Sequence, residues 1–183
     1  MKRAFCTLLI LISITISLTY IFYEPPSGVK QVVVDWENKS IVIPDSQYVC
    51  QGSESKLLSS LPSYRLYVVI DTLGCTACSM QIDEWKFFLE ASMERKSQHF
   101  LLIFVTNTRN ATKVKSILMS HGLPGSMVME APCDFYATNN ISKEWQYRTF
   151  LTDRANKVLL LRSPLYSEGL RELYLELLCS SKS

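Results

Sequence analysis

The feature that most constrains the fold is a Cys-x-x-Cys motif, Cys75-Thr76-Ala77-Cys78, which stands between two different hydrophobic patterns. The residues before it, Leu66 to Ile70, form a continuous apolar run that is typical of a β-strand. After it, apolar side chains recur at helical spacing, at Cys78, Ile82, Trp85, Leu89 and Met93. The motif is therefore predicted to lie at a junction between a strand and a helix.

This position would give the two thiols different surroundings. Cys75 is expected at a helix N-terminus, where unpaired backbone N–H groups and the helix dipole stabilise a thiolate. Cys78 follows one turn later, on the apolar face that the helix turns toward a sheet. An exposed, acidic thiol with a shielded thiol within reach is what thiol–disulfide exchange requires. We therefore predict Cys75 and Cys78 as the catalytic residues.

Two alternative roles for the motif remain open. A Cys-x-x-Cys can supply half of a structural zinc site, but the chain has no second pair, and its other cysteines and its two histidines lack ligand spacing. The pair could also be a passive disulfide, although so short a ring closes little loop entropy and would stabilise little. We expect no metal and no cofactor.

The N-terminal segment has the composition of a membrane anchor. Met1-Lys2-Arg3 is a short basic start, and Ala4 to Tyr23 carry no charge. About twenty apolar residues suffice to span a bilayer. A cleaved signal peptide is the alternative, but residues 20–26 are bulky and offer no small-x-small site. We predict a signal anchor at residues 1–23, with the rest of the chain on the periplasmic side of the membrane.

The exported part has the length of one domain. Residues 24–29, rich in proline and glycine, are predicted as a tether. Residues 30–63 are predicted as an N-terminal hairpin extension, with strands at 31–36 and 41–44 and a brief helix at 56–61. A net charge of +2 without any Lys/Arg-rich run does not favour nucleic acid as a partner.

Residues 64–180 are predicted as the main domain, in which strand and helix patterns alternate. Strands are expected at 66–71, 99–105 and 126–130, a helix at 109–121, and a hairpin at 148–152 and 157–161. The last helix is predicted from an apolar stripe at Leu170, Leu173, Tyr174, Leu177 and Leu178. This order predicts an α/β fold with a mixed sheet flanked by helices.

This element order, with the Cys-x-x-Cys motif at the first strand–helix junction, resembles the thioredoxin fold. Residues 68–78 and the hairpin at 149–159 carry a closer resemblance to TlpA-like proteins, the membrane-tethered or lipid-anchored thioredoxin-like proteins that bacteria export. The resemblance implies a periplasmic thiol–disulfide oxidoreductase in which Cys75 attacks and Cys78 resolves. The implied partners are exported thiol or disulfide proteins, or a membrane reductant.

The chain departs from the family pattern in ways that concern substrate handling. Gly74 stands where the family usually has tryptophan, and Arg148 stands where it has a cis-proline that exposes backbone to the substrate. A cis bond at a non-proline residue costs about 2.5–4 kcal/mol, so we expect a trans bond at Arg148. Its guanidinium could lie near Cys75 and stabilise the thiolate by charge. The alternative is a surface arginine on an edge strand.

Two other functions follow from these departures. The missing proline favours a non-catalytic interaction module that keeps the fold and uses its surface to bind a partner. Thr72-Leu73-Gly74-Cys75 also matches part of the peroxiredoxin pattern, but Val68 stands where that pattern requires proline. The intact Cys75–Cys78 pair favours thiol–disulfide exchange over both.

Overall fold

The structure is a computed structural model that describes residues 36, 39–43, 48–51, 54–57, 60–62, 64–70, 80–95, 100–123, 126–132 and 134–180. The predicted anchor and tether, the thiols Cys75 and Cys78, and Cys133 lie outside them. None of the helices in the described ranges is long and apolar enough to cross a membrane.

A mixed sheet forms the centre of the fold, and its described strands run in the order β2-β1-β5-β4-β3-β6-β7. Three parallel strands make up its middle: β3 (Tyr64–Val69), β4 (Phe100–Thr106) and β5 (Ser126–Glu130). Antiparallel strands extend it on both sides: β6 (Thr149–Thr152) and β7 (Val158–Leu161) beside β3, and β1 (Tyr48–Gln51) and β2 (Glu54–Leu57) beside β5.

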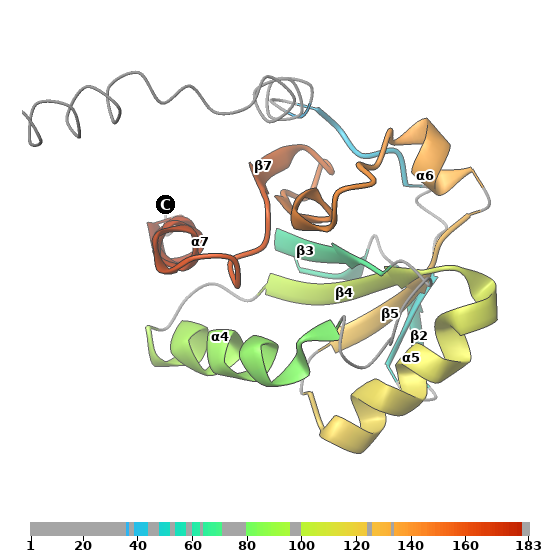
Figure 1. The fold of residues 1–183 in the computed structure, drawn as a ribbon, viewed down its shortest axis with the longest axis horizontal. Helices are drawn as coiled ribbons and strands as arrows, with labels where there is room; N and C mark the ends of the chain where they lie inside the picture. Colours follow the sequence, from blue (N-terminus) through green and yellow to red (C-terminus); the bar gives the residue numbers. More distant parts are fainter. Residues whose placement is uncertain are drawn as a thin grey trace, which may run out of the picture. The chain divides into compact units, whose positions relative to one another are not determined.

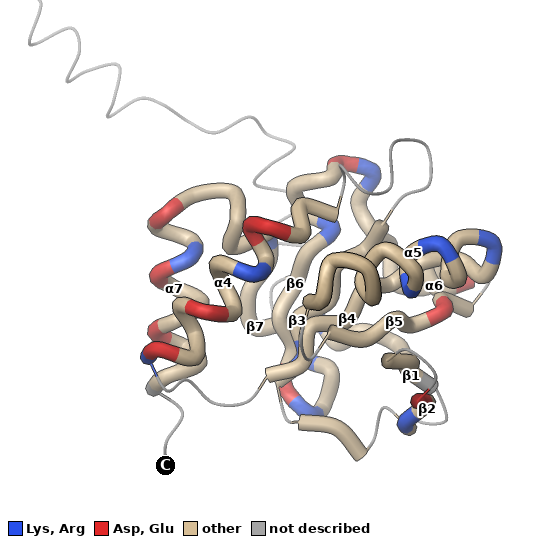
Figure 2. Tube along the Cα trace, turned by 90° about the horizontal axis from the view of Figure 1, so that it is seen from below, with Lys and Arg blue, Asp and Glu red and all other residues tan. Residues whose placement is uncertain are grey.

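Buried apolar side chains explain why β3 and β4 lie in the interior. Both strands are buried along almost their whole length, as expected for parallel strands covered on two faces. β4 carries no charged residue, and Figure 2 shows most of the charged residues on helices and turns. The predicted mixed α/β sheet flanked by helices is confirmed.

Helices α4 (Ile82–Glu94), α5 (Thr108–His121) and α7 (Glu168–Ser180) pack on one face of the sheet, where they share a single apolar core with β3, β4 and β5. The short helices α6 (Phe135–Thr138) and η2 (Trp145–Tyr147) connect β5 to β6. In Figure 1, α6 lies on the opposite side of the sheet from α4 and α5. The crossover helices therefore cover one face, and the connection to β6 crosses the other.

Local signals set the ends of α5. The side chain of Asn107 accepts a hydrogen bond from the backbone N–H of Asn110 at 3.2 Å, which caps the first turn. Gly122 ends the helix at φ 60°, the left-handed conformation that glycine adopts without steric cost. The predicted helix at residues 109–121 is therefore confirmed.

The predicted strand at 41–44 is wrong, because residues 41–43 belong to no strand, and Trp36, the last residue of the other predicted strand, is helical. Residues 31–35 of that strand lie outside the described residues. The described hairpin in this part of the chain consists of β1 and β2. Residues 39–43, which we call the edge segment, instead lie beside the turn before β7 and the start of that strand, where Ser40 forms an isolated bridge to Lys157. The alternation of buried Ile41, exposed Val42 and buried Ile43 does reflect an extended chain, but its partner is far away in the sequence.

Three smaller predictions are also wrong. Lys56 and Leu57 belong to β2 rather than to the predicted helix. This strand is exposed along its length, so its sequence lacks the alternation of apolar and polar residues that indicates a strand. Met93 in α4 and Leu173 in α7 belong to the predicted apolar faces but are 63% and 45% exposed. Phe88 and Leu175 are buried on those helices in addition to the predicted residues.

Candidate functional site

A strand and a helix flank the Cys-x-x-Cys motif, but α4 begins later than the predicted helix, whose apolar pattern included Cys78. β3 ends at Val69 and α4 begins at Ile82, so the motif lies between a strand and a helix. Gln81 directly precedes α4 in a left-handed conformation, with φ 47° and ψ 47°. Met80 is fully buried. The described residues on both sides of the motif are therefore anchored in the core.

A pocket of about 100 Å³ opens beside the carboxyl end of β3. Its wall combines this strand end with the start of α4 and with the turn that leads into β6, and it is lined by Val68, Val69, Ile70, Gln81, Trp85, Trp145, Arg148, Thr149 and Ser163. Trp85, predicted as a core residue of α4, is 2% exposed and forms part of this wall. The pocket thus lies between the end of β3, which precedes the motif, and Arg148, the position at which TlpA-like proteins have a cis-proline.

Arg148 lies directly before β6, and its backbone is bonded on both sides. Its carbonyl oxygen accepts a hydrogen bond from the Val69 N–H at 2.8 Å, and its own N–H donates to the Trp145 carbonyl at 3.1 Å. No peptide bond between described residues is cis. Both polar atoms of this residue's backbone are thus engaged within the protein, unlike a backbone that is free to pair with a substrate.

The Arg148 side chain holds the loop that precedes η2. Its Nε donates to the Ser142 carbonyl at 3.1 Å, and its Nη2 donates to the Lys143 carbonyl at 2.6 Å. The alternative prediction of an exposed arginine on an edge strand is wrong, because β6 pairs with both β3 and β7 and Arg148 is half-buried. Its proximity to the Cys75 sulfur stays a prediction.

Aromatic side chains that no sequence motif marks form part of this surface. Trp145 lines the pocket and is 62% exposed, and its ring lies 6.0 Å from that of Tyr166. The guanidinium of Arg162 lies over the Tyr166 ring at 4.1 Å. These residues come from η2 and from the segment after β7, so no single sequence window brings them together.

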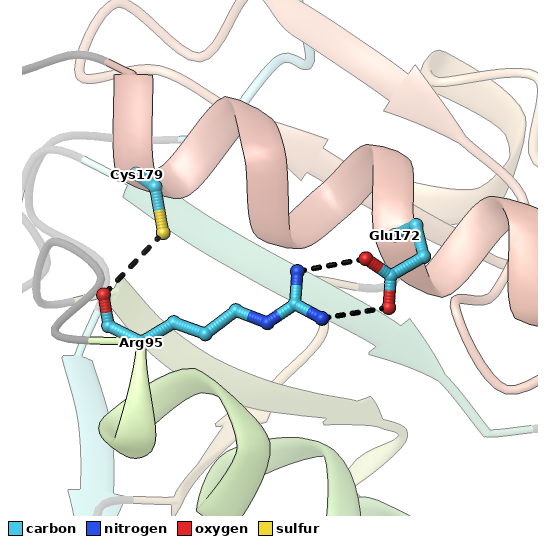
Figure 3. Close-up of polar contacts among 3 residues, drawn as sticks. All are labelled: Arg95, Glu172 and Cys179. Carbon is cyan, nitrogen blue, oxygen red and sulfur yellow. Dashed lines mark hydrogen bonds and ion pairs between the residues drawn. The ribbon is translucent and has the colours of Figure 1, made fainter.

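Two further cysteines are described, and both are free thiols. Cys179, near the end of α7, donates a hydrogen bond to the Arg95 carbonyl at 3.7 Å (Figure 3). The Arg95 guanidinium forms a bidentate pair with Glu172 at 2.7 and 2.9 Å, which connects the end of α4 to α7. Cys50 lies in β1, on the far side of β5. Among the described residues, no group of three His, Cys, Asp or Glu side chains could hold a metal ion.

No protein-family model and no curated protein matches the sequence. Solved structures do match the fold. An uncharacterised thioredoxin-like protein from Porphyromonas gingivalis superimposes with a TM-score of 0.54 at 17% identity, over 80% of this chain and 97% of that one. A thiol:disulfide interchange protein from Bacteroides sp. gives a TM-score of 0.54 at 13% identity, over 80% and 94%.

A peroxidoxin from Mycobacterium tuberculosis is similar to the same extent, with a TM-score of 0.54 at 12% identity over 80% of this chain and 98% of that one. At these identities the similarity concerns the arrangement of the backbone. It agrees with the strand order and with the helices that follow β3 and β4. The chain therefore has a thioredoxin-like fold.

Proposed function

We propose that this chain is an exported thiol–disulfide exchange protein whose redox pair is Cys75 and Cys78. The proposal rests above all on the place of this pair, between the end of β3 and the start of α4 in a thioredoxin-like fold. A thiol at a helix N-terminus is favoured as a thiolate, the form that attacks a disulfide. In the proposed reaction the Cys75 thiolate attacks a disulfide of the client, and Cys78 then resolves the mixed disulfide.

A second candidate is a non-catalytic interaction module with the same fold. The hydrogen bonds of Arg148 favour it, because both polar backbone atoms at this position are already paired with Val69 and Trp145. A substrate strand would have to find its backbone partners elsewhere. The enzyme remains our first proposal, because a module would not need two thiols at this spacing.

A redox titration of the full chain tests the proposal. The protein is equilibrated in a series of buffers that differ in the ratio of reduced to oxidised dithiothreitol. Its free thiols are then trapped by alkylation, and mass spectrometry of its peptides identifies the modified cysteines. We expect Cys75 and Cys78 to become oxidised together as one two-electron couple. A pair that stays reduced under oxidising buffers would contradict exchange and favour the interaction module.

Alkylation rates test the roles of the two thiols separately. Cys75 should react faster than Cys78 near neutral pH, because the sequence predicts that Cys75 alone is exposed at a helix N-terminus. Cys78→Ser should trap mixed disulfides through Cys75, because the resolving thiol is gone. The matched control is Cys179→Ser, which should trap none. Equal, slow alkylation of both thiols would count against the assigned roles.

The location is proposed from the sequence of the first residues. An uncharged span after Lys2 and Arg3 would keep the chain anchored, with its domain facing the periplasm and exported thiol proteins or a membrane reductant as partners. N-terminal sequencing of the mature protein checks this. An intact start supports the anchor, whereas a new N-terminus between Tyr20 and Gly28 would mean a cleaved signal peptide.

A further inference from the structure

Trp145 and Tyr166 form an exposed aromatic pair beside the pocket at the end of β3. Their ring centroids lie 6.0 Å apart, both rings are exposed, and Trp145 also lines the pocket. Among the described residues, these are the two exposed aromatic rings that pack against each other. Tryptophan, tyrosine and arginine are the side chains that most often dominate binding at protein interfaces. The pair is therefore a candidate surface for a partner.

Arg162 gives this surface a positive charge. Its guanidinium lies over the Tyr166 ring at 4.1 Å and lies 5.6 Å from the Tyr147 ring. Its Nη2 donates a long hydrogen bond of 3.4 Å to the side chain of Gln146, and its buried Nε has no partner among the described residues. None of the ion pairs between described residues includes Arg162. The guanidinium thus keeps both charge and hydrogen-bonding capacity for a further group.

The backbone fixes where this guanidinium lies. Arg162 has φ 85°, in the left-handed region that side chains other than glycine rarely adopt. Two bonds hold it there: its N–H donates to the Thr149 carbonyl at 2.9 Å, and its carbonyl accepts from the Tyr174 hydroxyl at 2.6 Å. Strained residues that their surroundings hold in place are found at sites that clamp ligands. A side chain that is already positioned also loses less entropy when a partner binds.

We propose that Trp145, Tyr166 and Arg162, which we call the aromatic–arginine surface, bind a segment of the client protein in which a carboxylate side chain lies next to an apolar one. The carboxylate accepts charge-assisted hydrogen bonds from the Arg162 guanidinium, and the apolar side chain packs on the exposed Trp145 ring. This inference rests on the proposed exchange function, because it names the kind of client.

The surface also gives the client a way to bind that does not use the backbone of Arg148. Both polar atoms of that backbone are already bonded within the protein, so recognition through side chains takes the place of pairing with a strand. Because Trp145 lines the pocket at the end of β3, the segment is bound next to the strand that leads to the Cys-x-x-Cys motif.

A peptide selection tests the chemistry of the partner without using the thiols. The full chain with Cys75→Ser and Cys78→Ser is exposed to a library of short random peptides that lack cysteine. We expect the bound peptides to be enriched in Asp or Glu next to a large apolar residue. One enriched peptide is then compared with its amide form, in which each carboxylate is replaced by an amide, and the acidic form should bind about tenfold more tightly.

Tryptophan fluorescence locates the binding. Trp36 and Trp85 are buried and Trp145 is exposed, so quenching by acrylamide reports mainly on Trp145. The acidic peptide should protect Trp145 from the quencher. If Trp145 becomes protected as the protein concentration rises without peptide, the surface binds a second copy of the chain, and the proposal is overturned.

Substitutions assign the acidic preference to one side chain. Arg162→Gln should weaken binding of the acidic peptide about tenfold and remove its advantage over the amide form. Arg162→Lys keeps the charge but not the planar stacking, so it should restore only part of the affinity. The matched control is Arg171→Gln, because the Arg171 guanidinium also lies over an exposed ring, that of Phe87 at 5.3 Å, but does not line the pocket. This control should leave binding unchanged.

The results separate this inference from the exchange function. A selection without enrichment in acidic peptides, an affinity that Arg162→Gln leaves unchanged, or an equal loss in Arg171→Gln would overturn the aromatic–arginine surface, even if Cys75 and Cys78 titrate as a couple. If the selection succeeds and the redox titration fails, binding of an acidic segment becomes the property of the interaction module.

Discussion

At the scale of single residues, Arg148 shows how one side chain can organise the turn that leads into an inner strand. Its guanidinium holds two consecutive carbonyl oxygens, those of Ser142 and Lys143, while its backbone joins η2 to the end of β3. A proline at this position could make neither side-chain contact and could not donate to Trp145. The arginine therefore stabilises the turn by means that differ from those of a cis-proline.

This arrangement predicts the effect of removing the side chain. Arg148→Ala should lower the free energy of unfolding by about 1–2 kcal/mol, because two charge-assisted hydrogen bonds to carbonyl groups are lost. Urea denaturation measures the change. Arg154→Ala is the control, because Arg154 is exposed in the β6–β7 turn, and it should alter stability by less than about 0.5 kcal/mol. Equal stability of the two variants would show that the contacts to the loop contribute nothing.

The same variant tests the predicted influence of Arg148 on the redox pair. If the guanidinium also lies near Cys75, Arg148→Ala should slow alkylation of Cys75 near neutral pH, because a nearby cation favours the thiolate. Arg148→Lys keeps the charge but not the bidentate geometry, so it should retain the alkylation rate better than it retains stability. Unchanged alkylation in Arg148→Ala would limit the role of Arg148 to the turn.

At the scale of elements, the edge segment protects β7. Its residues bond to the β6–β7 turn and to the first residue of β7: the Ile41 N–H donates to the Asn156 carbonyl and the Val158 N–H donates to the Lys39 carbonyl, each at 2.8 Å. On its other side, Asn139 accepts from the Val42 N–H at 2.7 Å and donates to the Val42 carbonyl at 3.1 Å. An uncovered strand edge offers free backbone groups to other chains, and this segment occupies part of that edge.

Asn139 is fully buried and is the residue on which this arrangement depends most. Asn139→Ala should cost about 2–3 kcal/mol of unfolding free energy, because the buried Asn139 side chain would no longer make its two hydrogen bonds to the Val42 backbone. Thermal or urea unfolding gives the value. Thr138→Ala changes the exposed last residue of α6, directly before Asn139, and should have little effect. A similar loss of unfolding free energy in both variants would show that the effect comes from α6 and not from the contacts to the edge segment.

The elements also show what the sequence could and could not predict. β3, β4, α5 and the β6–β7 hairpin follow from local patterns, since their burial is set by residues close together in the chain. The edge segment does not, because its partners are Asn139 and the turn around Asn156. The same holds for the site. The motif identifies Cys75 and Cys78, but the approach of Trp145 to Tyr166 depends on packing between η2 and the segment after β7.

At the scale of the whole molecule, buried tyrosines are expected to lower the free energy of unfolding as the pH becomes alkaline. Burial raises the pKa of Tyr67 to about 12 against the lowering influence of Arg65, and burial also raises the pKa of Tyr174. The Tyr174 hydroxyl donates to the Arg162 carbonyl at 2.6 Å, which ties α7 to the segment after β7. Both hydroxyls must be protonated in the folded protein at a pH where the unfolded chain would already ionise them.

Because these pKa values are raised in the folded protein, alkaline pH favours the unfolded state. The folded pKa of Tyr67 lies above the value of 10.0 in an unfolded chain, so its contribution is complete below about pH 10 and is lost as the pH rises toward 12. The loss attributable to Tyr67 should reach roughly 2–3 kcal/mol. Tyr67→Phe should flatten the curve of unfolding free energy between these pH values, whereas Tyr166→Phe, at an exposed ring, should leave it steep. Identical curves for the parent and Tyr67→Phe would contradict this assignment.

The pairing of Ser40 with Lys157 and of β1 with β5 has a consequence for the time order of folding. A growing chain releases the edge segment and the β1–β2 hairpin before their partners exist. Local units such as β3-α4-β4 can close early, because short loops cost less entropy to close than long ones. The edge segment cannot dock until the β6–β7 hairpin has formed. The first described residues to leave the ribosome are therefore among the last to reach their native positions.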